Sequence, residues 1–168
     1  MPEAIKAFVR NVEAFNRGVG RLMMYGIFVM MAILLWSSFS KTFLVPSVWT
    51  LEMAQFALTA YYLLGGAYSI QLGSNVRMDL VYGGWSDRTK AWVDAFSVFC
   101  LMFFLGVLLY GGIESTTYAF QYNERSYSAW RPYMAPIKVI MCFGIVMMLL
   151  QAIAEFFKDI ARIRGEEI

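Results

Sequence analysis

The sequence predicts an all-α integral membrane protein with four transmembrane helices, both termini in the cytoplasm, and an N-terminal amphipathic helix at the membrane interface. Of its 168 residues, 60% are hydrophobic and only 15% are charged, whereas a soluble domain has roughly 45–50% apolar and about 25% charged residues. Crossing a bilayer takes about 20 apolar residues, and four runs are of this length: 22–40, 48–72, 91–113 and 136–157. Because only short polar segments separate them, we expect one membrane domain over residues 1–168.

The segment before the first run, residues 2–17, has the pattern of an amphipathic helix. Its apolar residues recur at helical spacing: Ile5, Phe8, Val9, Val12 and Phe15. The opposite face carries Lys6, Arg10, Glu13 and Arg17. Helices of this kind lie in the headgroup region with their apolar face toward the acyl chains. We therefore expect this segment to lie on the cytoplasmic leaflet.

The distribution of Lys and Arg predicts the orientation of the four spans. The N-terminal segment, the loop between the second and third runs, and the C-terminal tail lie on one side and hold ten of these residues. The other side holds four. Cytoplasmic flanks carry the excess of positive charge, so both termini are expected inside.

The second run carries a stripe of polar and small residues on one helix face. The stripe consists of Glu52, Gln55, Thr59, Tyr62, Gly66, Ser69 and Gly73. Small residues let helices approach closely and polar ones hydrogen-bond between helices, so this face should pack on protein. The sequence leaves open whether that protein is the chain itself or another subunit. Off the stripe, Leu63 and Ile70 are expected to face lipid.

Glu52 is an ionisable residue inside an apolar run, which by default suggests a functional site. It lies only four residues past the start of the run, near the outer interface, where the helix dipole favours a carboxylate. We therefore interpret it as structural, with a partner contact or an ion relay as alternatives. At the other side of the membrane, Glu155 and Lys158 are spaced to form an ion pair.

Composition excludes several classes of function. The chain has no histidine, so haem anchoring, His-ligated metal sites and Ser-His or Cys-His nucleophile pairs are excluded. We expect no enzyme activity and no metal site. A formal net charge of +2 gives no basic field for nucleic acid. We expect no cofactor, with a structural phospholipid left open.

Two connecting segments carry charged motifs. The first, after the second run, places Arg77 and Asp79 two residues apart. The second leads into the fourth run with Glu124, Ser126, Ser128, Pro136 and Lys138. In this order, together with Glu52 and four spans, these motifs resemble the DctQ-type small membrane subunit of tripartite ATP-independent periplasmic (TRAP) transporters. The resemblance covers residues 17–157. This chain departs from it at Asn123, where the family often has Gly, and at Ala135, where it often has Trp.

The resemblance implies a small, non-catalytic scaffold subunit in the bacterial cell inner membrane. Its complex would import an organic acid with sodium. A large multi-span subunit would hold the substrate and sodium sites, and a periplasmic substrate-binding protein would deliver the acid. The stripe residues Glu52, Gln55, Thr59, Gly66, Ser69 and Gly73 then become the expected partner interface, and Arg125 and Arg131 the expected docking groups at the outer face. The identity of the acid and the number of sodium ions do not follow from this chain.

Two other functions remain open at this point. An autonomous four-span exporter needs a membrane-embedded carboxylate in a central cavity, whereas Glu52 is peripheral. A membrane anchor subunit of a redox complex without histidine retains only a quinone pocket, which no sequence motif marks.

Overall fold

The computed structural model describes residues 3–73 and 87–164, and within these ranges it is all-helical, as predicted. The helices are α1 (Glu3–Met24), α2 (Gly26–Phe43), α3 (Thr50–Gln71), α5 (Asp87–Gln121) and α6 (Ala135–Arg164). The one β-type pairing among the described residues is an isolated bridge between Arg125 and Tyr133.

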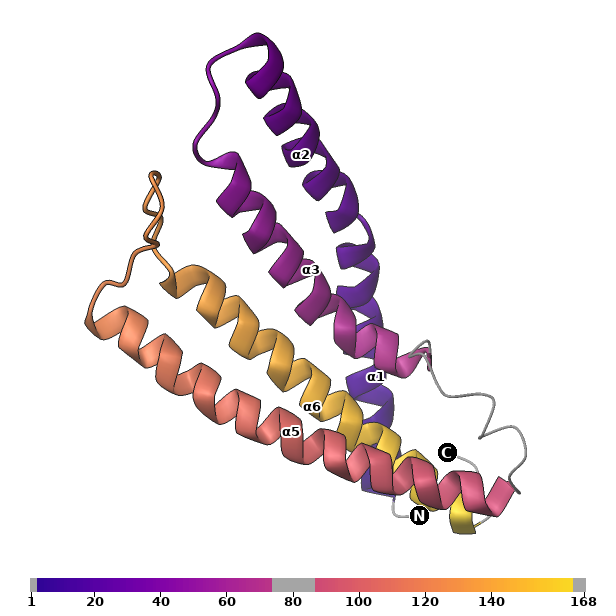
Figure 1. Cartoon of the computed structure of the whole chain (residues 1–168). Coiled ribbons are helices and arrows are strands. Elements are labelled where there is room, and N and C mark those ends of the chain that lie inside the picture. The colour runs from indigo at the N-terminus through magenta and orange to yellow at the C-terminus, as the bar shows by residue number, and fades with distance from the viewer. Residues whose placement is uncertain (1–2, 74–86, 165–168) are drawn as a thin grey trace.

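Helix α6 is the central element of the bundle. It packs against α5, α3 and α1, and α3 also packs against α2 and α1. The α2–α3 pair and the α5–α6 pair diverge toward the end that carries the connections 44–49 and 122–134, which we call the loop end (Figure 1). The first residues of α1 and the last residues of α6 lie at the opposite end, which we call the termini end, and there α1 lies against α3 and α6.

The first two helices are almost continuous, which differs from the predicted boundaries at residues 17 and 22. Helix α1 runs to Met24, and Tyr25 alone separates it from α2. The backbone N–H of Tyr25 donates to the Leu22 carbonyl, and the Tyr25 carbonyl accepts from Phe28, both at 3.1 Å. The helix does not stop near residue 17 because Gly20 packs against Tyr68 of α3, which holds this stretch in the bundle.

Helix α1 turns part of its apolar pattern toward protein, together with polar and small residues. Val9, Asn16 and Gly20 are buried, whereas Phe15 is 53% exposed. The side of α1 that meets the bundle is therefore partly polar, because α6 supplies hydrogen-bond partners for it.

The core lies where α5, α6 and α3 meet. Leu105, Ile145 and Ala152 form its buried centre, and Leu63 packs against it. A Cβ atom built on Gly144 would lie 2.8 Å from the Leu63 Cβ, so α3 and α6 approach closely at this point. The expectation that Leu63 faces lipid is wrong, because Gly144 leaves room for it between the two helices.

Helix α5 extends eight residues past the predicted end of its span, Ile113, and ends at Gln121. Polar side chains in this extension bond to the backbone of the same helix. The hydroxyls of Thr116 and Thr117 donate to the carbonyls of Gly112 and Ile113, at 2.7 and 2.9 Å.

Among the described helices, three segments are long and apolar enough to cross a membrane: Glu3–Phe43, Trp92–Gln121 and Ala135–Ala161. Helix α3 has 22 residues, long enough by the same measure, but its hydropathy is below that of these three segments. Glu52, Gln55 and its tyrosines lower its hydropathy, so length and composition alone identify three spanning segments and not four.

Candidate functional site

Glu52 ties α3 to the connection between α5 and α6 at the loop end. It lies in the first turn of α3 and is 8% exposed. Its Oε1 accepts a hydrogen bond from the Ser126 hydroxyl at 2.8 Å. Its Oε2 is buried without a hydrogen-bond partner among the described residues. The helix N-terminus stabilises the carboxylate, so the geometry supports a structural contact between two elements of this chain.

Lys138 fixes the same connection to the start of α6. Its ammonium group forms an ion pair with Glu124 and donates to the Ser115 carbonyl at 3.4 Å. The Glu124 carbonyl in turn accepts from the Met134 backbone N–H at 3.0 Å. The two motif residues Glu124 and Lys138 are therefore in contact, and their ion pair fixes the connection to the start of α6.

Both arginines of this connection are exposed. The guanidinium carbon of Arg125 lies 4.3 Å from the centroid of the Tyr133 ring, and Arg125 also donates to the Tyr133 hydroxyl. The backbone N–H of Arg131 donates to the Ser128 hydroxyl at 3.2 Å, in a turn where Arg131 has a φ of +50°. The connection is thus a hydrogen-bonded hairpin that presents two cations at the loop end.

A buried hydroxyl cluster joins α2 to α3, and the sequence patterns did not reveal it. Thr50 donates to the Ser37 hydroxyl at 3.0 Å, and the hydroxyls of Ser40 and Ser47 lie 3.0 Å apart. Ser37, Ser40 and Thr50 are at most 5% exposed. The i, i+3 spacing of the two serines on α2 was the available signal, but serines are too common near helix ends for it to stand out.

The termini end has a larger polar network between α1 and α6. Asn16 donates to Gln151 Oε1 at 2.7 Å, and Gln151 donates to Glu155 at 3.0 Å. Lys158 forms ion pairs with Glu13 and with Glu155, both at 2.7 Å. The predicted pair of Glu155 and Lys158 is confirmed. Sequence reasoning missed the partners on α1, because about 140 residues separate them from α6.

The structure divides the stripe on α3 between two sides of the helix. Glu52 is buried, and Gly66 approaches Met148 of α6, with 3.0 Å from its would-be Cβ to the Met148 sulfur. Gln55 and Tyr62 are exposed, whereas Thr59 and Ser69 are half-buried. Thr59 also donates to the Gln55 carbonyl at 2.9 Å. Part of the stripe therefore packs on α6, and part faces outward from the chain.

The remaining motif residues mark helix ends or lie elsewhere. Gly73 follows the end of α3 with a φ of +61°, a conformation that glycine adopts without strain. Pro136 lies in the first turn of α6, where its missing N–H costs no helical hydrogen bond. Arg77 and Asp79 lie outside the described residues.

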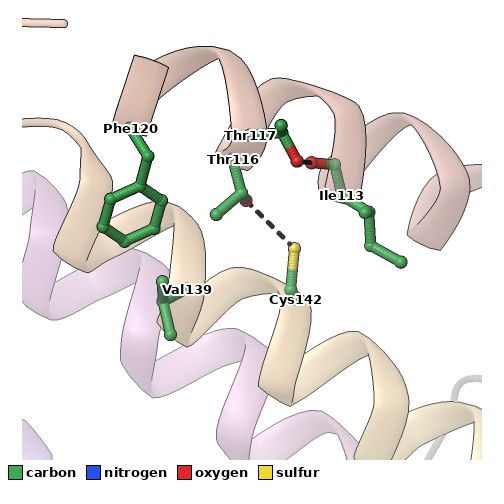
Figure 2. Close-up of a pocket in the computed structure, with 6 residues that line it drawn as sticks. All are labelled: Ile113, Thr116, Thr117, Phe120, Val139 and Cys142. Atoms are coloured by element: carbon green, nitrogen blue, oxygen red, sulfur yellow. Dashed lines mark hydrogen bonds between the residues drawn. The ribbon is translucent and has the colours of Figure 1, made fainter. Parts of the chain in front are cut away.

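An open hollow of about 360 Å³ lies between α5 and α6 near the loop end. Figure 2 shows its lining, in which the Thr116 hydroxyl lies 3.3 Å from the Cys142 sulfur. The other lining residues are Ile113, Thr117, Phe120 and Val139. The hollow is mostly apolar, and nothing in its lining suits catalysis. In the part of the chain that the structure describes, no group of three His, Cys, Asp or Glu residues is placed to hold a metal ion.

Comparison with known proteins adds the family. Residues 30–162 match the family described as Tripartite ATP-independent periplasmic transporters, DctQ component. No curated protein and no solved structure matches the chain. The family match covers well over half of the 168 residues and includes Glu52, the hairpin and most of α6. It confirms the family that the motifs indicated. The chain therefore belongs to the DctQ family and is a small permease component of a TRAP transporter.

Proposed function

We propose that this chain is a non-catalytic scaffold subunit of a sodium-coupled importer of an organic acid in the bacterial inner membrane. Its partners are a large multi-span subunit, which carries the substrate and the sodium ions, and a periplasmic protein that delivers the acid. The family supports the class of transporter. The assignment of a scaffold role to this chain rests on the contacts of its polar side chains.

One observation carries the scaffold role. Several charged and amide side chains within the helices join elements of the chain to each other. Glu52 holds the hairpin, Lys138 holds Glu124, and Gln151 holds Asn16. Groups that conduct ions must exchange partners, whereas groups engaged in fixed contacts between helices stabilise one arrangement. This use of polar groups favours a static subunit.

The proposed topology has four spans, with α1 and α2 together forming the first and α3 the second. Helix α3 packs between α2 and α6, so it crosses with them although its hydropathy is lower. Lys138 and Lys158 lie 20 residues apart on α6, about 30 Å at the helical rise, which equals the thickness of the hydrocarbon core. The excess of Lys and Arg places the termini end in the cytoplasm. The loop end is then periplasmic.

In this orientation the hairpin faces the periplasm with Arg125 and Arg131 exposed. We propose that these cations help to dock the periplasmic protein. Exposed charges of this kind act mainly on the association rate, and salt screens them. No cofactor is proposed. One acyl chain of a structural phospholipid would fit in the hollow between α5 and α6.

The test is to purify this chain together with the large membrane subunit and the periplasmic binding protein, and to reconstitute the three proteins in liposomes. A tag on this chain should retain the large subunit, and uptake of the organic acid should need all three proteins and a sodium gradient. Transport by this chain alone in liposomes would support the exporter alternative instead. A large subunit that transports at the full rate without this chain would contradict the scaffold role.

A further inference from the structure

Helix α3 has one face that no other described element covers. It consists of Leu51, Gln55, Leu58 and Tyr62, which follow one another at spacings of four and three residues; we call it the open α3 face. Tyr62 is 66% exposed and Leu51 is 59% exposed. The face lies between the side of α3 that meets α6 and the side that meets α2, so the described part of the chain leaves it uncovered.

The exposed residues of α2, α5 and α6 are mostly large and apolar. On α6 they include Val139, Ile140, Phe143, Val146 and Leu150. On α2 they include Phe28, Met31, Leu35 and Phe39, and on α5 Phe96, Phe99, Phe103 and Val107. These side chains suit contact with acyl chains. The exposed Tyr110 of α5 also carries a phenol hydroxyl, but this hydroxyl donates to Glu114, whereas no described residue hydrogen-bonds to the Gln55 carboxamide or the Tyr62 hydroxyl of the open α3 face.

The depth of these two groups makes contact with lipid unfavourable. Gln55 follows Glu52 by three residues and Tyr62 follows it by ten, which places them about 4–5 Å and about 15 Å further into the membrane. Tyr62 is then near the middle of a hydrocarbon core about 30 Å thick. No described residue hydrogen-bonds to the Gln55 carboxamide. In hydrocarbon neither water nor lipid tails would satisfy it.

We infer that the open α3 face is the surface on which a transmembrane helix of the large subunit sits. The inference rests on the proposed function and adds to it the place of contact. A helix that fits this face presents small residues around the Tyr62 ring and a hydrogen-bonding group opposite Gln55. A second copy of this chain fits poorly on the open α3 face. A two-fold contact would place the bulky side chains of Leu51, Leu58 and Tyr62 in one copy against the same side chains in the other, whereas close helix contacts in membranes use small residues.

Site-specific photo-crosslinking in the purified complex tests the inference. The photoreactive amino acid p-benzoylphenylalanine replaces Tyr62 or Leu58 in turn, with Leu35 on α2 and Phe103 on α5 as exposed controls. A tag on the large subunit isolates complexes, which are then irradiated. We expect a covalent adduct with the large subunit from Tyr62 and Leu58 and none from the two controls.

The other outcomes separate this inference from the proposed function. If the complex is recovered but adducts form only from Leu35 or Phe103, the large subunit sits elsewhere and the inference is wrong, although the proposed function stands. An adduct of two copies of this chain from Tyr62 would overturn it in the same way. If the unmodified chain is not retained by the large subunit, the proposed function fails and the inference fails with it.

A second variant distinguishes assembly from folding. In Gln55→Leu the exposed amide becomes a side chain that lipid accommodates, so the isolated subunit should unfold at an unchanged or higher temperature. The yield of complex should nevertheless fall severalfold, because the hydrogen bond to the partner helix is lost. The matched control is Leu35→Met, which should change neither quantity. Full recovery of the complex with Gln55→Leu would contradict the inference.

Discussion

The ion pairs at the two ends of α6 differ in how far apart in the sequence their two residues lie. At the loop end Lys138 pairs with Glu124, only 14 residues before it, in the hairpin that leads into the helix. At the termini end Lys158 pairs with Glu13 on α1, 145 residues away in the chain. The first contact therefore fixes a loop on its own helix, whereas the second fixes the position of a whole helix. The same residue types at the two ends of one helix thus have unequal structural consequences.

The termini end also brings more charged groups together, because Lys158 pairs with two carboxylates, Glu13 and Glu155, whereas Lys138 pairs with Glu124 alone. Its ion pairs adjoin the amide pair of Asn16 and Gln151, which are 1% and 0% exposed. Removing a cation that two carboxylates share is more costly than removing one that pairs with a single carboxylate, because the two like charges left behind repel each other. The comparison therefore predicts that substitutions at the termini end destabilise more.

The largest effect is expected from Lys158→Met. This substitution leaves two carboxylates, Glu13 and Glu155, close together without a cation, and it should lower the stability by about 3 kcal/mol. Thermal unfolding in detergent measures the loss, and limited proteolysis should show earlier cleavage in α1. The variant that also carries Glu13→Gln and Glu155→Gln should recover part of the stability. A loss no larger than that of Lys138→Met would contradict the difference between the two ends.

Between the two ends, Gly144→Ala should destabilise by about 2 kcal/mol, because the added methyl group would overlap the Leu63 side chain and backbone of α3. Gly106→Ala on α5 is the matched control, since nothing lies within 4 Å of the added methyl group. The control should be neutral or slightly stabilising. Equal unfolding temperatures for the two variants would mean that α3 and α6 do not approach as described.

At the loop end, Ser126→Ala should cost about 1.5 kcal/mol, because the buried Glu52 carboxylate loses the hydrogen bond that its Oε1 accepts. The effect should be specific to this hydroxyl. Ser128→Ala, which removes an exposed contact of the Arg131 backbone, should change the unfolding temperature less. Identical losses in both serine variants would show that Glu52 is not held by Ser126.

The smallest effect is expected from Lys138→Met, about 1 kcal/mol, because Glu124 is 30% exposed and can turn to water. Hydrogen exchange should become faster in the hairpin, at the Met134 amide that donates to the Glu124 carbonyl, and remain unchanged in α1. Faster exchange in α1 would show that this pair acts over the whole bundle.

The helices predicted from the sequence agree with the structure where apolar periodicity and hydropathy determine where a helix forms. The four apolar runs lie within or across helices of the structure, and the ion pair of Glu155 and Lys158 follows from its spacing. Helix α1 was harder to place, because its apolar face suggests a membrane surface while its partners are polar groups on α6. Those partners are distant in the sequence, and no local pattern predicts them.

The site was predictable in its residues but not in its contacts. The motif that identified the family contains Glu52, Ser126, Glu124 and Lys138, yet spacing alone does not show that Ser126 bonds to Glu52 or that Lys138 turns back to Glu124. The sequence also does not show that the α3 stripe is divided between a side that packs on α6 and a side that faces outward. A stripe about 100° wide has two edges, and the positions of the neighbouring helices decide which edge is covered.

The central claim is that Glu52 and the other polar groups of this chain are structural contacts and not ion ligands. Uptake by the reconstituted complex of the Glu52→Gln variant, measured across a sodium titration, tests it most directly. The amide oxygen of Gln still accepts the Ser126 hydrogen bond, so the half-saturating sodium concentration and the Hill coefficient should equal those of the unchanged complex. Any loss of uptake should match the loss in complex yield. A shift in either sodium parameter at unchanged yield would mean that this subunit carries part of the ion site, and the scaffold account would be wrong.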